Sequence, residues 1–117
     1  METVQLPQII EKQYDIHNWL LLKVKKFPRD LRYFIGTSIY DSSKNLLDTL
    51  TAAYYTSQQD QKFIYLNQAS ITLEQLRIHL RVAFNQKIIN AKSLQFVVQL
   101  LLEIGKMLGA WLKSIQP

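Results

Sequence analysis

The chain has 117 residues, 48% hydrophobic and 20% charged, a composition that predicts one globular domain over 1–117 rather than a disordered chain. It contains no cysteine, which excludes disulfides, thiolate chemistry and cysteine-based metal sites. Its net charge of +5 makes polyanions and acidic protein surfaces reasonable partners, although lysines that only solubilise an apolar protein would give the same total.

The N-terminal segment METVQLPQIIEKQYD has early acidic residues and lacks the apolar core of a signal peptide. The longest apolar runs, such as 19–22 and 97–102, are far shorter than the roughly 20 residues that span a bilayer. We therefore expect a cytoplasmic protein with no membrane partner.

Turn-forming and capping residues divide the chain into four segments with helical periodicity. We expect helices at about 7–26, from residue 28 or 29 to 56 and, after the polar connection 57–60, up to residue 87. Asn90 has the position and chemistry of an N-cap for a fourth helix that reaches residue 115. Short links between long helices predict an all-α fold, an antiparallel up-down-up-down four-helix bundle.

The junction between the first two segments, KVKKFPRDLRYFIGTSIY at 23–40, combines positive charge with aromatic residues. Pro28 ends one helix and is suited to begin the next, so charge gathers at one end of the bundle. The basic residues of this junction are Lys23, Lys25, Lys26, Arg29 and Arg32. They predict a surface for nucleic acid or an acidic partner. Alternatively, Arg32 could lie over Gly36 one turn later and bond helix-end carbonyls.

Aromatic residues follow the helical stripes, so core packing is expected for most of the six tyrosines and two tryptophans. Tyr33, beside Arg32, could pack in a core or stack on a nucleic-acid base. The sequence leaves both interpretations open for this residue.

The third segment carries two arginines four residues apart. In LEQLRIHLRVAF at 73–84, Arg77 and Arg81 are expected to project together and to grip phosphates or carboxylates. Lys87 adds a third positive charge nearby. Glu74, three residues before Arg77, could satisfy part of this charge inside the bundle, but one acid cannot neutralise all three.

The fourth segment, SLQFVVQLLLEIGKMLGAWLKSI at 93–115, is apolar over well over half of its circumference. One stripe suits the bundle core, and the surplus beside it predicts contact with a second subunit. The residues expected at this oligomer interface are Leu100, Ile104, Met107 and Trp111. Gly105 and Gly109 would let another backbone approach closely. A central helix in a tightly wrapped monomer would also account for the wide apolar arc.

Catalytic and metal-binding patterns are not visible, so we expect a binding protein without enzymatic activity, cofactor or metal. His17 and His79 belong to different segments without local ligand patterns, and each is expected to be a half-buried helix residue. The sequence has no glycine-rich phosphate loop, and its acidic residues form no inward-facing pair suited to acid–base catalysis.

Three motifs, KKFPRDLRYFIGTSI at 25–39, LRIHLRVAF at 76–84 and EIGKMLGAWLK at 103–113, resemble the accessory variability proteins of diversity-generating retroelements. These belong to a wider four-helix family that includes proteins encoded in intervening sequences of bacterial 23S ribosomal RNA genes. The resemblance covers roughly 12–115. The matching residues are Phe27, Pro28, Arg29, Arg32, Gly36, Arg77, Arg81, Gly105, Gly109 and Trp111. His79 departs from the pattern, since relatives often carry a large apolar or aromatic residue there.

This resemblance implies a homopentameric ring with a basic surface. It implies a partner of the retroelement's reverse transcriptase that binds RNA or DNA and supports mutagenic copying of template RNA into cDNA. We expect binding dominated by phosphate contacts, because no base-reading constellation is visible. Two alternatives stay open: a stand-alone bundle of the intervening-sequence type that binds RNA or an acidic protein without a polymerase, and a structural oligomer that meets an acidic protein.

Overall fold

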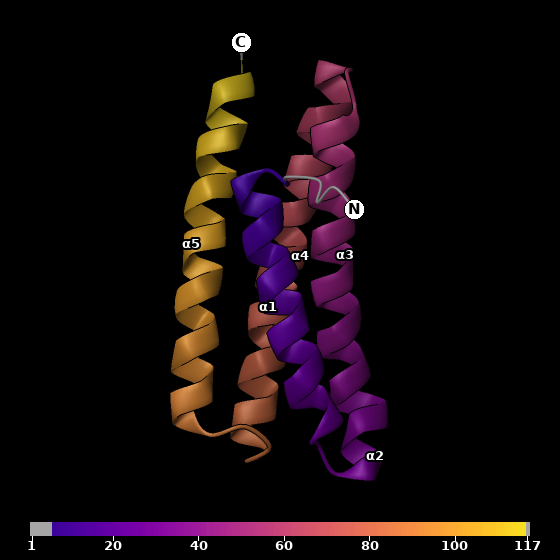
Figure 1. Ribbon diagram of the computed structural model, residues 1–117, viewed down its shortest axis with the longest axis vertical. Coiled ribbons are helices and arrows are strands. Elements are labelled where there is room, and N and C mark those ends of the chain that lie inside the picture. Colours follow the sequence, from indigo (N-terminus) through magenta and orange to yellow (C-terminus); the bar gives the residue numbers. More distant parts are fainter. Residues whose placement is uncertain (1–5, 117) are drawn as a thin grey trace, which may run out of the picture.

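The computed structural model describes residues 6–116, which form helices and no strand (Figure 1). The long helices are α1 (Gln8–Lys25), α3 (Thr37–Tyr55), α4 (Gln59–Asn85) and α5 (Ala91–Ile115). Two short segments, α2 (Arg29–Leu31) and η1 (Arg32–Gly36), join α1 to α3. The prediction of an all-α protein with four long helices is therefore confirmed. Residues 1–5, which open the segment predicted not to be a signal peptide, and residue 117 lie outside the described residues.

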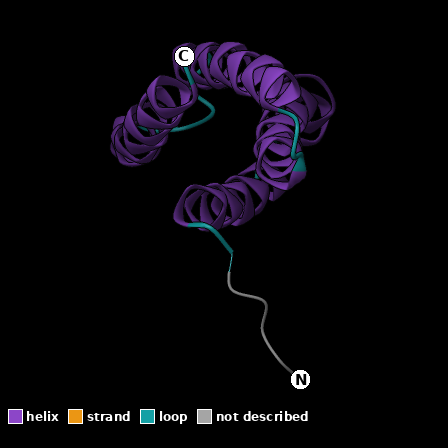
Figure 2. Cartoon of the chain, turned by 90° about the horizontal axis from the view of Figure 1, so that it is seen from above, coloured by secondary structure: helices purple, strands orange, loops and turns teal. Residues whose placement is uncertain are grey.

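The chain descends along α1 in Figure 1, rises along α3, descends along α4 and rises along α5. Figure 2 shows, along the helix axes, that the four long helices form an open arc. Side chains join α1 to α5 across its opening: Lys12 Nζ lies 3.2 Å from Glu103 Oε2, and the Trp19 and Phe96 rings are 5.3 Å apart. The bundle is thus closed on this side by side-chain contacts.

The core consists mainly of aliphatic side chains that recur every three or four residues on the inner faces of the helices, with Phe27 added from the link after α1. On α4 the buried residues are Leu66, Ala69, Leu73, Leu76, Leu80 and Ala83. On α5 they are Val97, Leu101, Ile104 and Leu108. Burial of each large aliphatic side chain contributes about 1.5–3 kcal/mol, so packing of these stripes stabilises the helices more than intrinsic propensity does.

The start of α5 follows its sequence prediction. The Asn90 side chain accepts a hydrogen bond from the Ser93 amide at 2.8 Å and caps the helix. Pro7, expected in the first turn of α1, instead occupies the N-cap position. The helix that was expected to end at Thr56 ends one residue earlier, where the backbone becomes extended.

The end of α4 comes two residues earlier than predicted because the chain turns left-handed there. Lys87 has a φ of 62°. The amides of Lys87 and Ile88 donate hydrogen bonds to the carbonyls of Phe84 and Ala83, each at 2.9 Å. This pattern is a Schellman motif, in which glycine usually occupies the left-handed position. Lys87 therefore carries a backbone strain that glycine would avoid.

The second predicted helix is not a continuous α-helix, because η1 is a π-helical turn. The Thr37 amide bonds to the Arg32 carbonyl, five residues earlier. Gly36 is buried at this turn, and a Cβ atom on it would lie 2.8 Å from Val24 Cγ1 and 3.5 Å from Phe27. Glycine at this position therefore allows the start of the second helix to approach the end of α1 closely.

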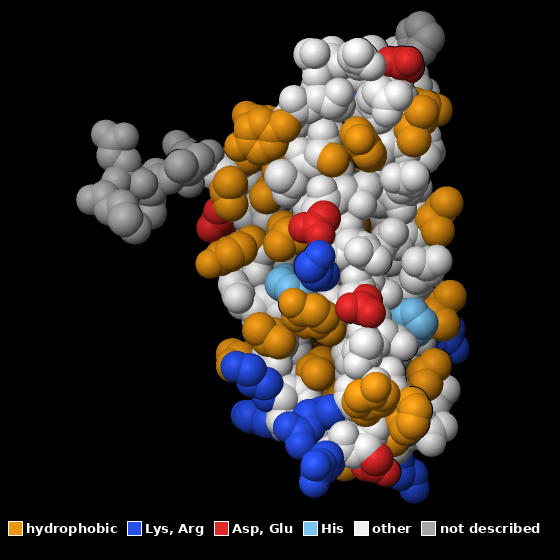
Figure 3. Space-filling view, turned by 90° about the vertical axis from the view of Figure 1, so that its right-hand side faces the viewer, with side chains coloured by type: hydrophobic (Ala, Val, Ile, Leu, Met, Phe, Trp, Pro, Cys, Tyr) orange, Lys and Arg blue, Asp and Glu red, His pale blue; other side chains and the backbone are white. Residues whose placement is uncertain are grey.

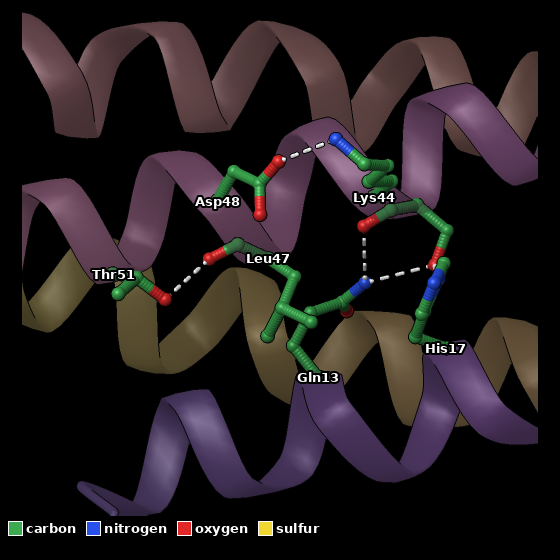
Figure 4. Close-up of polar contacts among 7 residues, drawn as sticks. Gln13, His17, Lys44, Leu47, Asp48 and Thr51 are labelled. Atoms are coloured by element: carbon green, nitrogen blue, oxygen red, sulfur yellow. Dashed lines mark hydrogen bonds and ion pairs between the residues drawn. The ribbon is translucent and has the colours of Figure 1, made fainter.

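A polar network is buried between α1 and α3 (Figure 4). Gln13 Nε2 donates to the Ser43 carbonyl and to Ser43 Oγ, both at 3.1 Å, and His17 Nδ1 lies 2.8 Å from the same hydroxyl. Burial lowers the pKa of His17 below its ordinary value of 6.5, against an opposing effect of Asp48. His17 and His79 are both half-buried helix residues, as predicted.

Candidate nucleic-acid interface

Positive charge gathers where α1 ends, α2 follows and α4 leads into α5, at the lower end of the bundle in Figures 1 and 3. The eight residues of this basic end are Lys23, Lys25, Lys26, Arg29, Arg32, Arg81, Lys87 and Lys92. Within the same stretches, Asp30 is the one acidic residue that the structure describes. Eight positive charges and one negative charge give +7 here and leave −2 for the rest of the chain. The charge is therefore distributed far more unevenly between the basic end and the rest of the chain than the net charge of +5 indicates.

The basic end unites seven of the eight residues predicted to bind nucleic acid or a partner. Sequence reasoning missed Lys92, in the first turn of α5, although its place beside the Asn90 cap was a usable signal. Lys23 is partly buried, because its Nζ donates to Ser93 Oγ at 3.2 Å and lies 5.1 Å from the Trp19 ring centroid. Its position is thereby fixed at the α1–α5 contact.

Arg29 and Arg32 are exposed, and neither forms a salt bridge with a residue in the range 6–116. The alternative for Arg32, a bond from its guanidinium to helix-end carbonyls over Gly36, is not realised by any hydrogen bond among the described residues. Two guanidinium groups are thus directed to solvent at the basic end. Such groups bind phosphate oxygens with short, charge-assisted hydrogen bonds.

Arg77 is the one residue of the predicted binding set that does not belong to the basic end. Its Nη1 donates to Glu74 Oε1 at 2.6 Å, and its Nη2 donates to the Leu101 carbonyl of α5 at 3.2 Å. Gly105 makes room for the guanidinium, since a Cβ atom there would lie 3.2 Å from Nη2. The expectation that Arg77 projects beside Arg81 toward a ligand is corrected: Arg77 ties α4 to α5, and the alternative partner, Glu74, is the observed one.

The predicted oligomer interface is also corrected in part. Ile104 is fully buried in the core of its own bundle, so its assignment to a surface between subunits is wrong. The other three residues of that prediction are partly buried against the same core: Leu100, Met107 and Trp111. Contact of these three with a second subunit stays a prediction. α1 covers this side of α5, where Phe96 lies against Trp19.

A row of four apolar residues and two glutamines runs along the face of α4 that points away from the core. All six of its residues are exposed, and their spacing alternates between four and three as in a heptad repeat. We call this set the α4 outer row: Ile64, Gln68, Ile71, Gln75, Ile78 and Val82. This row was not predicted from the sequence, because the apolar core stripe of α4 was sufficient to explain why the segment is helical, and the opposite face of such a helix is usually polar. The regular spacing was the signal that could have revealed it.

A shallow groove of about 380 Å³ lies between α4 and α5 and is lined in part by Leu73, Leu102 and Gly109. A Cβ atom on Gly109 would meet no other atom within 4 Å. The two glycines of α5 therefore differ, because Gly105 accommodates Arg77 of its own chain while the space above Gly109 is open.

Aromatic side chains are more exposed than predicted. Trp19 and Trp111 pack partly against the core, as expected. Four of the six tyrosines are exposed, so the prediction of core packing is wrong for Tyr14, Tyr54 and Tyr55. The fourth is Tyr33, for which two interpretations were open, and its exposure excludes the core. Tyr33 and its neighbour Phe34 belong to the basic end in space, since both lie in η1 directly after Arg32.

Metal binding and membrane insertion are two further kinds of function that side chains in the range 6–116 bear on. These residues contain no group of three or more His, Asp or Glu side chains that could hold a metal ion. α5 is the one described helix that is long and apolar enough to cross a membrane by length and composition alone. Core helices of water-soluble proteins that are mostly buried meet the same criteria, whereas 22% of the most apolar 18-residue stretch of α5 is buried.

Comparison with protein families decides the relationship. A family model described as bAvd-like matches residues 8–115, a range that contains all four long helices and the whole basic end. The chain belongs to the bAvd-like family. The resemblance to accessory variability proteins is thus confirmed, and the three motifs that suggested it all lie within the bAvd-like match. A comparison with curated proteins finds no match.

Proposed function

We propose that this bAvd-like chain is a non-catalytic, cytoplasmic accessory protein of a diversity-generating retroelement. It binds the element's reverse transcriptase and, through its basic end, template RNA or cDNA, and so supports mutagenic copying. The observation that carries the proposal is the charge of +7 at one end of the bundle. Lysine and arginine that neutralise phosphates release counterions, so the binding is salt-sensitive and weakly sequence-specific.

We also propose that each subunit is an antiparallel bundle and that five subunits form a ring. The α4 outer row supports association, because exposed apolar residues at heptad spacing suit packing against a second helix. In a ring, rotation places the same end of every subunit on the same rim. Five copies of a chain with a net charge of +5 carry +25, and their basic ends form one continuous surface for a polyanion.

The test compares two double variants that remove the same charge from different places. Lys25→Ala/Lys26→Ala removes two exposed lysines from the basic end, and Lys106→Ala/Lys113→Ala removes two exposed lysines from the rest of the molecule. We expect the first variant to bind a fluorescein-labelled stem–loop RNA more weakly. Its plot of log K against log salt loses about one unit of slope for each lost phosphate contact. The second variant binds like the wild type.

Fluorescence anisotropy over a salt series supplies both the affinity and the slope. Equal weakening of the two variants would mean that binding follows net charge and not the basic end, which contradicts the proposal. A pull-down with tagged reverse transcriptase tests the second partner. RNA binding without any association with the polymerase would favour the stand-alone bundle instead.

A further inference from the structure

Tyr33 and Phe34 are the two most exposed large hydrophobic side chains among the described residues, at 78% and 68%. Both lie in η1, between exposed Arg32 and buried Gly36. Their ring centroids are 5.8 Å apart with an angle of 81° between the planes, an edge-to-face pair. The two rings therefore orient each other while most of their surface faces water.

The fold keeps these two rings outside the core. The inner side of η1 contacts α1 through Gly36, where even a Cβ atom would lie 2.8 Å from Val24. Large rings cannot enter that contact without separating the two helices. A π-helical turn inside a helix is also a feature that occurs frequently at functional sites. The exposure of both rings is thus a consequence of how the second helix is anchored.

We infer that Tyr33 and Phe34 form a stacking platform for bases of single-stranded nucleic acid, an inference that rests on the proposed binding by the basic end. Exposed aromatic rings bind bases by stacking, and adjacent guanidinium groups bind the phosphates of the same strand. Arg29 and Arg32 supply such groups, since no described residue pairs with either in a salt bridge. The faces of paired bases are already stacked in a duplex, so the platform selects single strands.

The surrounding charge distinguishes this ligand from an apolar protein partner. Exposed aromatic residues can also be central contacts in a protein interface. Here they directly follow Arg32, at the end of the bundle that carries eight basic residues and one acidic residue, Asp30. Five of those eight are lysines, which are depleted in protein interfaces. A positively charged groove with aromatic rings is instead the usual arrangement for binding a single strand.

The experiment compares Tyr33→Ala/Phe34→Ala with Tyr54→Ala/Tyr55→Ala. The control pair lies at the other end of α3 and is also exposed and edge-to-face, with centroids 4.9 Å apart. Affinities for labelled oligothymidylate and for its duplex with oligoadenylate are measured by fluorescence anisotropy. We expect the first variant to lose roughly 5- to 100-fold in affinity for the single strand and little for the duplex. The control pair should match the wild type, and circular dichroism verifies that each variant stays helical.

Two further variants separate stacking from apolar contact. Tyr33→Leu/Phe34→Leu keeps an apolar surface without ring faces and should remain weak, whereas Tyr33→Trp/Phe34→Trp should bind the single strand at least as well as the wild type. Full binding by the leucine variant would overturn the inference. So would a wild-type protein that binds duplex and single strand equally.

The failure of this inference can be distinguished from failure of the proposed function. Unchanged single-strand binding by Tyr33→Ala/Phe34→Ala, together with weak binding by Lys25→Ala/Lys26→Ala, would overturn the platform and leave the basic end in place. A wild-type protein that binds neither oligonucleotide would overturn both. If Tyr33→Ala/Phe34→Ala lost association with reverse transcriptase but kept its affinity for the single strand, the rings would be a contact for the polymerase, and the inference would be overturned.

Discussion

Two arginines one helical turn apart occupy different environments in this protein. Arg77 donates to a side chain of its own helix and to a main-chain carbonyl of α5, whereas Arg81 is exposed. Residues four apart lie on the same face of a helix, so the sequence spacing alone suggests that both arginines could bind one ligand. The two arginines differ because Arg77 reaches α5 beside Gly105, where a side chain would obstruct it, and is thereby engaged in the fold. Arg81 makes no such contact with a described residue and is available to a ligand.

Arg77→Ala should therefore lower the free energy of unfolding by about 1–3 kcal/mol, because it leaves a partly buried carbonyl without its charged donor. Arg81→Ala should stay within about 0.5 kcal/mol of the wild type and should instead weaken RNA binding. Urea denaturation and RNA anisotropy on both variants measure the two effects. The assignment would be wrong if Arg77→Ala unfolded like the wild type but bound RNA poorly.

Lys87 illustrates a conflict between stability and charge at a single residue. The Schellman motif requires a left-handed backbone at this position, which costs a residue with a side chain about 1–2 kcal/mol. Glycine would avoid that cost, but it would remove one of the eight charges of the basic end.

We expect Lys87→Gly to raise the free energy of unfolding by about 1 kcal/mol and to weaken RNA binding. Lys87→Ala is the matched control, since it removes the charge and keeps the strained backbone. Both variants should lose the same RNA affinity, and only the glycine variant should become more stable in urea. If both variants became more stable, the gain would come from removing the repulsion between the Lys87 charge and its neighbours, and not from relieving backbone strain.

The outward face of α4 carries apolar residues at a regular spacing that packing within the bundle does not require. Its outer row has isoleucine seven residues apart at 64, 71 and 78, with Gln68, Gln75 and Val82 four residues after each, and none of these residues contributes to the core of its own bundle. A helix that only covered the core would need no apolar residues on the opposite side.

Ile71→Glu should therefore dissociate the proposed oligomer, because a charge would be buried at the centre of the row. Leu22→Glu is the matched control: Leu22 is 59% exposed on α1 and Ile71 is 61% exposed on α4. Size exclusion with light scattering should give about five times 13.7 kDa for the wild type and the control. It should give a smaller mass for Ile71→Glu.

Monomers of all three proteins at micromolar concentration would contradict the assembly itself. A pentamer that tolerates Ile71→Glu would place the contact elsewhere, and the partly buried residues Leu100, Met107 and Trp111 of α5 would become the next set to test.

The elements were largely predictable because local chemistry determines them. The Asn90 cap and the α5 periodicity were sufficient to place that helix. The π turn was not predictable, because it lies where Gly36 packs closely against Val24 of α1 and Phe27 just after it, which the local sequence does not specify. The buried position of Ile104 escaped prediction for a related reason. Periodicity gives the width of an apolar face, but not which neighbouring helix covers each part of it.

At the scale of the whole molecule, the basic end was predictable from the alternation of long helices and short links. Segments that are far apart in the chain meet wherever a helix ends, so the charges before α2 join those at the α4–α5 link. The exposure of Tyr33 and Phe34 could not be deduced, because the same apolar residues are equally suited to a core. Their location required the three-dimensional contact at Gly36.

With +7 at one end and −2 on the remainder, the molecule is an electric dipole in a body measuring 45 × 36 × 23 Å. Copies that associate side by side with like ends together repel one another, and a bound polyanion removes that repulsion. Assembly and nucleic-acid binding are then thermodynamically linked, so each increases the equilibrium constant of the other by the same factor. Added salt has two opposite effects in such a system. It screens the repulsion between basic ends and so favours assembly of the free protein, but it lowers the affinity of the assembled protein for RNA.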